Sequence, residues 1–222
     1  MRVAVVGATG AVGREILKVL EARNFPLSEL RLYASPRSAG VRLAFRGEEI
    51  PVEPLPEGPL PVDLVLASAG GGISRAKALV WAEGGALVVD NSSAWRMDPN
   101  VPLVVSQVNP GALTTHNGIV ANPNCSTMQL APLLKALSDA AGLERVVVAT
   151  YQAVSGAGAK AVADAGTPAA AGEIRHGARP GLVHHGTVLR TGDVRVPRGH
   201  RAARVRQRRA RGSSSYSSEG RR

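Results

Sequence analysis

The sequence of 222 residues predicts an α/β fold, a doubly wound and mostly parallel sheet followed by an incomplete second domain. Up to residue 160, short apolar runs rich in β-branched residues alternate with segments of helical periodicity. Continuously apolar strands alternating with helices are typical of a parallel sheet that is covered on both faces. A glycine-rich turn joins the first apolar run to the first helical segment, and the alternation stops beyond residue 160.

The first strand is expected at residues 2–6, where four of the five residues are Val or Ala. Residues 11–23 follow as an amphipathic helix, because their apolar side chains recur at helical spacing. Two more β-branched or apolar runs predict strands at residues 30–34 and 62–67. Between them, the five prolines of residues 51–61 indicate a surface connection.

The same alternation continues toward the single cysteine. Helical spacing and β-branched runs are again the signals, and glycines or prolines separate the segments. The predicted elements are a helix at residues 71–83, a strand at 86–90, short extended runs at 102–105 and 118–121, a helix at 126–140 and a strand at 145–151.

The positive charge lies almost entirely in the last part of the chain. The sequence has 27 Lys+Arg and 17 Asp+Glu, of which residues 1–160 contain 14 and 13, so residues 161–222 contain 13 and 4. All the cations of this second segment are Arg, and its apolar residues follow no helical or strand period. Such a segment buries too little apolar surface to offset its ordering entropy. We therefore expect an Arg-rich, disordered tail at residues 161–222.

Composition also restricts the partners. No 18-residue apolar run is present, so we expect no membrane association, and the single Cys excludes an internal disulfide framework and a multi-Cys metal site. A lone Cys is typical of a reducing compartment, which predicts a cytoplasmic protein. The pI of about 10.9 favours a nucleic-acid partner, but no aromatic residue interrupts the Arg run of residues 201–211. Nucleic-acid binding by the tail is the less favoured hypothesis.

A glycine-rich segment, GATGAVG at residues 7–13, follows the first predicted strand and opens the first predicted helix. Glycines permit a tight turn and close approach of the backbone to a pyrophosphate, and the helix N-terminus offers unpaired N–H groups. In this context the segment predicts a dinucleotide site in a Rossmann-like domain. The alternative is a turn that contains glycine for packing alone.

The end of the second predicted strand indicates which dinucleotide binds. NAD sites usually place an acid there for the ribose 2′-OH, whereas a 2′-phosphate needs a cation and hydroxyls. Residues 33–40 read YASPRSAG, with no acid and with Arg37 between Ser35 and Ser38. This pattern favours NADP, and the alternative is a solvated turn with an incidental Arg.

Cys125 stands at the start of a predicted helix, in the segment ANPNCST at residues 121–127. Free N–H groups and the helix dipole stabilise a thiolate at that place, which makes the thiol a usable nucleophile. A buried, inert Cys is the alternative. A thiolate beside a nicotinamide is the chemistry of a phosphorylating aldehyde dehydrogenase.

Taken together, these segments resemble bacterial aspartate-semialdehyde dehydrogenases. The resemblance covers residues 1–160 almost without interruption. The segments that carry it are GATGAVG (7–13), SPRSAG (35–40), SAGGGIS (68–74), VVDNSSAWRMD (88–98), ANPNCST (121–127) and TYQAVSGAG (150–158).

The resemblance implies NADP-dependent reduction of aspartyl phosphate to aspartate semialdehyde and phosphate, in the biosynthesis of lysine (through diaminopimelate), threonine and methionine. It implies a homodimer. Cys125 would be the nucleophile that forms a thioester, Gln152 would orient the substrate, and Arg96 would bind phosphate or the substrate's phosphoryl group. The implied NADP contacts are Thr9, Gly10, Ala11, Val12, Arg37, Ser38, Ser155 and Gly156.

The resemblance is weak beyond residue 160. We expect a cofactor-binding domain at residues 1–124, the start of the catalytic and dimerisation domain at 125–160, and then the tail, with the family's C-terminal part truncated or out of frame. Arg195 and His200 are the candidates for the family's substrate-binding Arg and its general acid/base His. Two competing functions stay open, those of an N-acetylglutamyl-phosphate reductase-like enzyme and of an inactive NADP-binding fragment.

Overall fold

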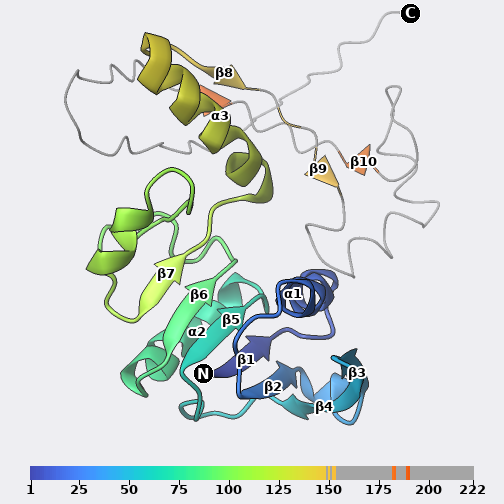
Figure 1. The fold of residues 1–222 in the computed structure, drawn as a ribbon. Helices are drawn as coiled ribbons and strands as arrows, with labels where there is room; N and C mark the ends of the chain where they lie inside the picture. The colour runs from blue at the N-terminus through green and yellow to red at the C-terminus, as the bar shows by residue number, and fades with distance from the viewer. Residues whose placement is uncertain (149, 151, 154–181, 184–188, 191–222) are drawn as a thin grey trace, which may run out of the picture.

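The computed structural model describes residues 1–148, 150, 152–153, 182–183 and 189–190. Its main feature is a seven-stranded sheet with the strand order β3-β4-β2-β1-β5-β6-β7 (Figure 1). Neighbouring strands are parallel throughout, except that β3 and β4 are antiparallel. The strands are β1 (Arg2–Val6), β2 (Glu29–Ala34), β3 (Arg42–Phe45), β4 (Glu48–Pro54), β5 (Leu64–Ala67), β6 (Leu87–Asp90) and β7 (Ile119–Ala121).

The chain winds outward from β1 in both directions. β2 and β4 lie on one side of β1, and the chain then crosses over to place β5, β6 and β7 on the other side. This reversal puts a topological switch point between β1 and β5, the place where doubly wound sheets bind ligands at the carboxyl ends of their strands. The predicted fold class is confirmed.

Two helices cover opposite faces of the sheet (Figure 1). Val5 of β1 packs in one apolar cluster with Leu17 of α1, and the neighbouring Ala4 packs in the other cluster with Trp81 of α2. Successive residues of a strand point to opposite faces, so each face of β1 receives one helix. The helices are α1 (Ala11–Ala22), α2 (Gly71–Glu83) and α3 (Cys125–Ala141), with short 3-10 helices η1 (Pro36–Ser38) and η2 (Pro110–Thr115).

The expectation of a surface connection at residues 51–61 is wrong for its first part. β3 and β4 form a hairpin whose two turn residues, Arg46 and Gly47, have φ of 51° and 80°. Pro51 fits inside β4 because β4 pairs with β2 only from Val52 onward, so the missing N–H breaks no bond of that ladder. The prolines hid a strand in which Ile50 is partly buried and Val52 is buried, while the residues next to each of them are exposed.

Smaller differences concern element ends. β5 begins two residues later than the strand predicted at residues 62–67. Of the extended run predicted at 102–105, only a bridge between Leu103 and Ala121 forms. The strand predicted at 145–151 contains β8 (Val147–Val148), and residues 149 and 151 lie outside the described residues.

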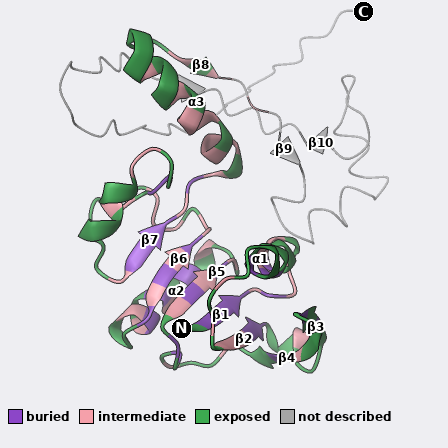
Figure 2. Cartoon of the chain, viewed as in Figure 1, coloured by how far each residue is buried: buried purple, intermediate pink, exposed green. Residues whose placement is uncertain are grey.

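Beyond the sheet, α3 carries the chain away from the two apolar clusters. None of its residues is buried, in contrast to the central strands (Figure 2). Two antiparallel pairs follow, β9 (Gln152–Ala153) with β10 (Leu182–Val183), and β8 with β11 (Leu189–Arg190). The predicted tail lies outside the described residues apart from β10 and β11. Among the helices that the structure describes, none has the length and apolarity needed to span a bilayer.

Candidate functional site at the carboxyl ends of the parallel strands

Four loops leave the same edge of the sheet. They begin at Gly7, Ser68, Asn91 and Asn122, directly after β1, β5, β6 and β7. Because these strands are parallel neighbours, their carboxyl ends meet at one edge. The segments GATGAVG, SAGGGIS, VVDNSSAWRMD and ANPNCST, far apart in the sequence, therefore meet at this edge.

The glycine loop packs so tightly that side chains are excluded at two positions. Gly7 has a φ of +86°, and a Cβ on it would lie 2.6 Å from the carbonyl oxygen of Ser68. A Cβ on Gly13 would lie 2.2 Å from the carbonyl oxygen of Gly7, so the first turn of α1 rests directly on the loop. Gly10 precedes α1 as its N-cap. The backbone N–H groups of the α1 N-terminus thus stand at the switch point between β1 and β5.

The cofactor residues predicted after the second strand lie in η1, which contacts the glycine loop. The hydroxyl oxygens of Thr9 and Ser38 are 3.3 Å apart and share a hydrogen bond that joins the glycine loop to η1. Arg37, in the middle of η1, is exposed. The structure thus brings Thr9, Gly10 and the start of α1, where Ala11 and Val12 lie, together with Ser38.

Arg96 lies in the loop after β6 and is held by carbonyl groups of that loop and of the loop after β7. Its Nε donates to the carbonyl oxygen of Asn122 at 2.8 Å, and its Nη2 donates to that of Asn91 at 2.9 Å. Burial lowers the pKa of Arg96 below its ordinary value, and the charges of Asp90 and Cys125 act in the opposite direction. Within the described part of the chain Arg96 forms no ion pair, so it is a partly buried cation suited to an anionic ligand.

Cys125 is the first residue of α3 and is exposed. Asn124 caps the helix, since its Oδ1 accepts hydrogen bonds from Ser126 N at 3.0 Å and from Ser126 Oγ at 2.5 Å. The Cys125 Sγ lies 3.9 Å from the same Oδ1. Two residues before the cap, the Nδ2 of Asn122 donates to the Oδ1 of Asn91 at 2.7 Å. The loop that presents the thiol is therefore bonded to the loop that holds Arg96.

Sequence reasoning assigned no role to Asp90, which the structure places at this edge. Asp90 is 1% exposed and ends β6. Its Oδ2 accepts hydrogen bonds from Ser74 Oγ and Ser92 Oγ, both at 2.7 Å, and its Oδ1 accepts one from Ser92 N at 2.9 Å. The sequence contained a signal for this cluster, because Asp90 directly ends an apolar strand. A carboxylate that is buried at such a place needs hydrogen-bond donors around it.

The remaining predicted site residues are less fully described. Gln152 lies in β9, where the backbone alone is described. Ser155, Gly156, Arg195 and His200 lie outside the described residues. Their predicted roles stay predictions.

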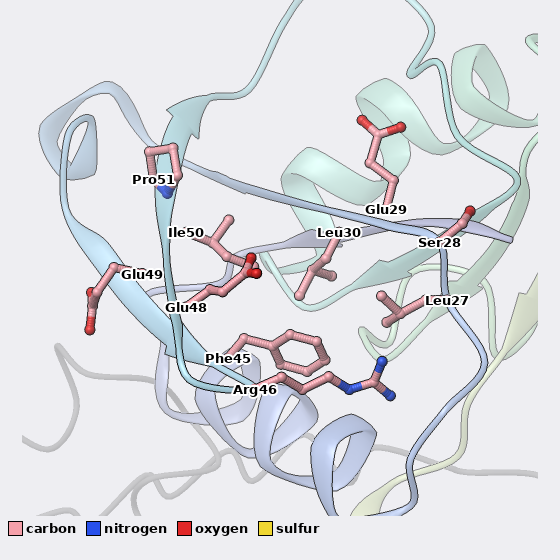
Figure 3. Close-up of a pocket in the computed structure, with 10 residues that line it drawn as sticks. All are labelled: Leu27, Ser28, Glu29, Leu30, Phe45, Arg46, Glu48, Glu49, Ile50 and Pro51. Atoms are coloured by element: carbon pink, nitrogen blue, oxygen red, sulfur yellow. The ribbon is translucent and has the colours of Figure 1, made fainter.

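A cavity of about 480 Å³ lies at the opposite edge of the sheet (Figure 3). It is formed where β2 and β4 begin, and none of the predicted site residues lines it. The cavity is lined by residues 27–30, Phe45, Arg46 and residues 48–51.

Among the described residues, no group of three or more His, Cys, Asp or Glu side chains is placed to hold a metal ion.

Comparison with protein families gives two adjacent matches. Residues 2–116 match the family described as semialdehyde dehydrogenase, NAD binding domain. Residues 134–187 match the semialdehyde dehydrogenase dimerisation domain, so this match extends past residue 160. An aspartate-semialdehyde dehydrogenase from Aquifex aeolicus is 58% identical over 167 residues, which are 73% of this chain and 49% of the relative. The chain thus spans about half the length of this relative.

Solved structures agree with these matches. Aspartate semialdehyde dehydrogenase II from Vibrio cholerae, complexed with ASA, has a TM-score of 0.69 and 44% identity, over 74% of this chain and 50% of the other. Aspartate semialdehyde dehydrogenase with NADP from Candida albicans has a TM-score of 0.56 and 28% identity, over 70% of this chain and 52% of the other.

Proposed function

Because the chain belongs to the semialdehyde dehydrogenase family, we propose that it serves NADP-dependent conversion of aspartyl phosphate to aspartate semialdehyde and phosphate. The observation that carries the proposal is the meeting of the glycine loop, Arg96 and Cys125 at one edge of the sheet. The relatives named above favour the aspartyl compound over its N-acetylglutamyl counterpart.

The described residues fit a dinucleotide with a 2′-phosphate. The space that a Cβ would need at Gly7 and Gly13 is already taken by backbone, which keeps the loop compact enough for a pyrophosphate to reach the N–H groups of α1. No acid follows β2, and Arg37 stands beside the Thr9–Ser38 pair. These groups favour NADP, which the relative from Candida albicans binds. When bound, NADPH supplies the hydride for the reduction.

Cys125 is the proposed nucleophile. Its thiolate attacks the carbonyl carbon of aspartyl phosphate, the bond from carbon to the phosphate oxygen breaks, and inorganic phosphate leaves with that bonding pair. The resulting thioester is reduced at the same carbon, and cleavage of the carbon–sulfur bond releases aspartate semialdehyde and restores the thiolate. Cys125 is the first residue of α3, at the end of a helix where the dipole attracts negative charge.

Arg96 is the proposed phosphate ligand. Its Nε and Nη2 are held by two backbone carbonyls, and a guanidinium without a carboxylate partner keeps its charge available for an oxyanion. We assign Gln152 to orientation of the substrate, and Ser155 with Gly156 to the nicotinamide end of the cofactor. The match of residues 134–187 to a dimerisation domain supports a homodimer.

The test is phosphate- and NADP-dependent oxidation of aspartate semialdehyde by the full chain, followed as NADPH absorbance. We expect turnover that Cys125→Ser abolishes while NADP binding, measured by calorimetry, is retained. Equal rates for Cys125→Ser and the unaltered chain would refute the thioester mechanism. NADP binding without turnover in both would identify a cofactor-binding fragment.

A further inference from the structure

The buried carboxylate of Asp90 is the centre of a hydrogen-bonded cluster that the proposed chemistry does not use. Its partners come from two separate elements, Ser74 from α2 and Ser92 from the loop after β6. Ser74 is itself 3% exposed. A buried carboxylate is stable only when donors surround it, so these contacts favour one arrangement of the two elements.

The cluster extends along the loop toward Arg96. Ser92 Oγ accepts a hydrogen bond from the backbone N–H of Ala94 at 3.1 Å. Trp95 Nε1 donates to Ser74 Oγ at 2.8 Å. Ser92 is thereby bonded directly to Asp90, Ala94 is attached to it through Ser92, and Trp95 is attached through Ser74. Arg96 directly follows Trp95.

The position of this loop decides where the Arg96 guanidinium lies. Its Nη2 reaches the carbonyl oxygen of Asn91 in the same loop, and its Nε reaches that of Asn122 in the loop after β7. A shift of the Arg96 backbone relative to β7 would break the second of these bonds. Nη1 makes no hydrogen bond to any residue that the structure describes. The Nε and Nη2 edge of the guanidinium is therefore bonded to the protein backbone, and the edge that carries Nη1 can donate to an oxyanion.

We propose that Asp90 is a positioning residue that, through Ser74 and Ser92, holds Arg96 in the orientation that binds phosphate. This inference rests on the proposed role of Arg96. It predicts that removing a hydroxyl of the cluster weakens phosphate binding without touching the glycine loop, where the dinucleotide would bind.

The experiment compares inorganic phosphate and NADP affinities of the full chain by calorimetry. Ser92→Ala removes the contacts to Asp90 Oδ2 and Ala94, and we expect phosphate affinity to fall about fivefold, as for the loss of one ordinary hydrogen bond, with NADP affinity unchanged. Ser74→Ala should act in the same way. Ser93→Ala is the matched control, because Ser93 is exposed in the same loop and has no hydrogen bond to a described residue. In an Arg96→Ala background, Ser92→Ala should have no further effect on phosphate binding.

Three results would overturn the inference, and they differ in what else they overturn. Normal phosphate affinity in Ser92→Ala and Ser74→Ala, with loss in Arg96→Ala, would refute the positioning role alone. Equal losses of phosphate and NADP affinity would show a general structural role in place of positioning. Equal phosphate affinity in Arg96→Ala and the unaltered chain would remove both the positioning role and the phosphate role of Arg96.

Discussion

The Nε of Arg96 donates a hydrogen bond to the carbonyl oxygen of Asn122 at 2.8 Å. This contact joins the loop after β6 to the loop that ends at Cys125, three residues beyond Asn122. An anion held by the guanidinium and an acyl group held by the thiol would therefore lie at neighbouring loops of the same sheet edge. The following predictions test the parts of this edge and one ion pair remote from it.

Arg37→Ala should lower NADP affinity by about tenfold or more and leave NAD affinity nearly unchanged. The reason is that a charge-assisted hydrogen bond to a 2′-phosphate contributes roughly 1.5–3 kcal/mol, and NAD lacks that group. Fluorescence titration with each cofactor measures the two affinities. Arg23→Ala is the matched control, since Arg23 is an exposed Arg at the other end of α1. A parallel loss of NAD affinity would contradict a role in 2′-phosphate recognition.

Gly13→Ala should destabilise the protein by about 3 kcal/mol, at the upper end of the usual cost of overpacking. The new Cβ would stand 2.2 Å from the carbonyl oxygen of Gly7, so the helix has to move away from the loop. Urea denaturation gives the free energy of unfolding of each variant and of the unaltered chain. Gly72→Ala is the control, because a Cβ there meets no atom within 4 Å and the change should be neutral or stabilising. Equal stability of the two variants would contradict the packing of α1 on the loop.

Asn124→Ala should cost about 1 kcal/mol of stability, because it removes the side-chain cap of α3. Thermal unfolding measures this loss of stability. Asn117→Ala, at an exposed position that makes no hydrogen bond to a described residue, should leave the stability unchanged. Equal stability of Asn124→Ala and the unaltered chain would argue against the cap.

The pair of Arg2 and Asp63 should make stability depend on pH. Hydrogen bonds from the Arg2 side chain, and then from its backbone N–H, hold the pKa of Asp63 below its ordinary 3.8. A carboxyl whose pKa is lower in the folded state contributes stability above the unfolded-state pKa, and that contribution is lost as the pH falls through the folded-state value. Asp63→Asn should therefore melt lower than the unaltered chain at pH 7, and the difference should shrink as the pH falls below 3.8 and vanish below the folded-state pKa.

The control for this pair is Glu83→Gln, because Glu83 is exposed and forms no ion pair with a described residue. Its melting temperature should equal that of the unaltered chain at every pH. A difference between Asp63→Asn and the unaltered chain that stays constant down to strong acid would show that the ion pair is not its cause.

Much of the fold could be predicted because its signals are local. β1, α1, α2 and β6 lie within a residue or two of the ranges that apolar periodicity indicated. The β3–β4 hairpin was missed because two prolines of β4 concealed an alternating strand, and only its pairing with β2 from Val52 onward explains why Pro51 is tolerated there. Strand pairing is a contact between distant segments, which a local pattern does not report.

By itself, the sequence determined the doubly wound class, the glycine loop, the absence of an acid after the second strand and the place of Cys125 at the start of a helix. Each of these depends on residues that are neighbours in the chain. Only the tertiary structure decided that Arg96 is supported by Asn91 and by Asn122, 26 residues away, and that Asp90 is shared by Ser74 and Ser92. The physical reason is that parallel strands bring their carboxyl ends to one edge, where loops from distant parts of the sequence complete each other's hydrogen bonds.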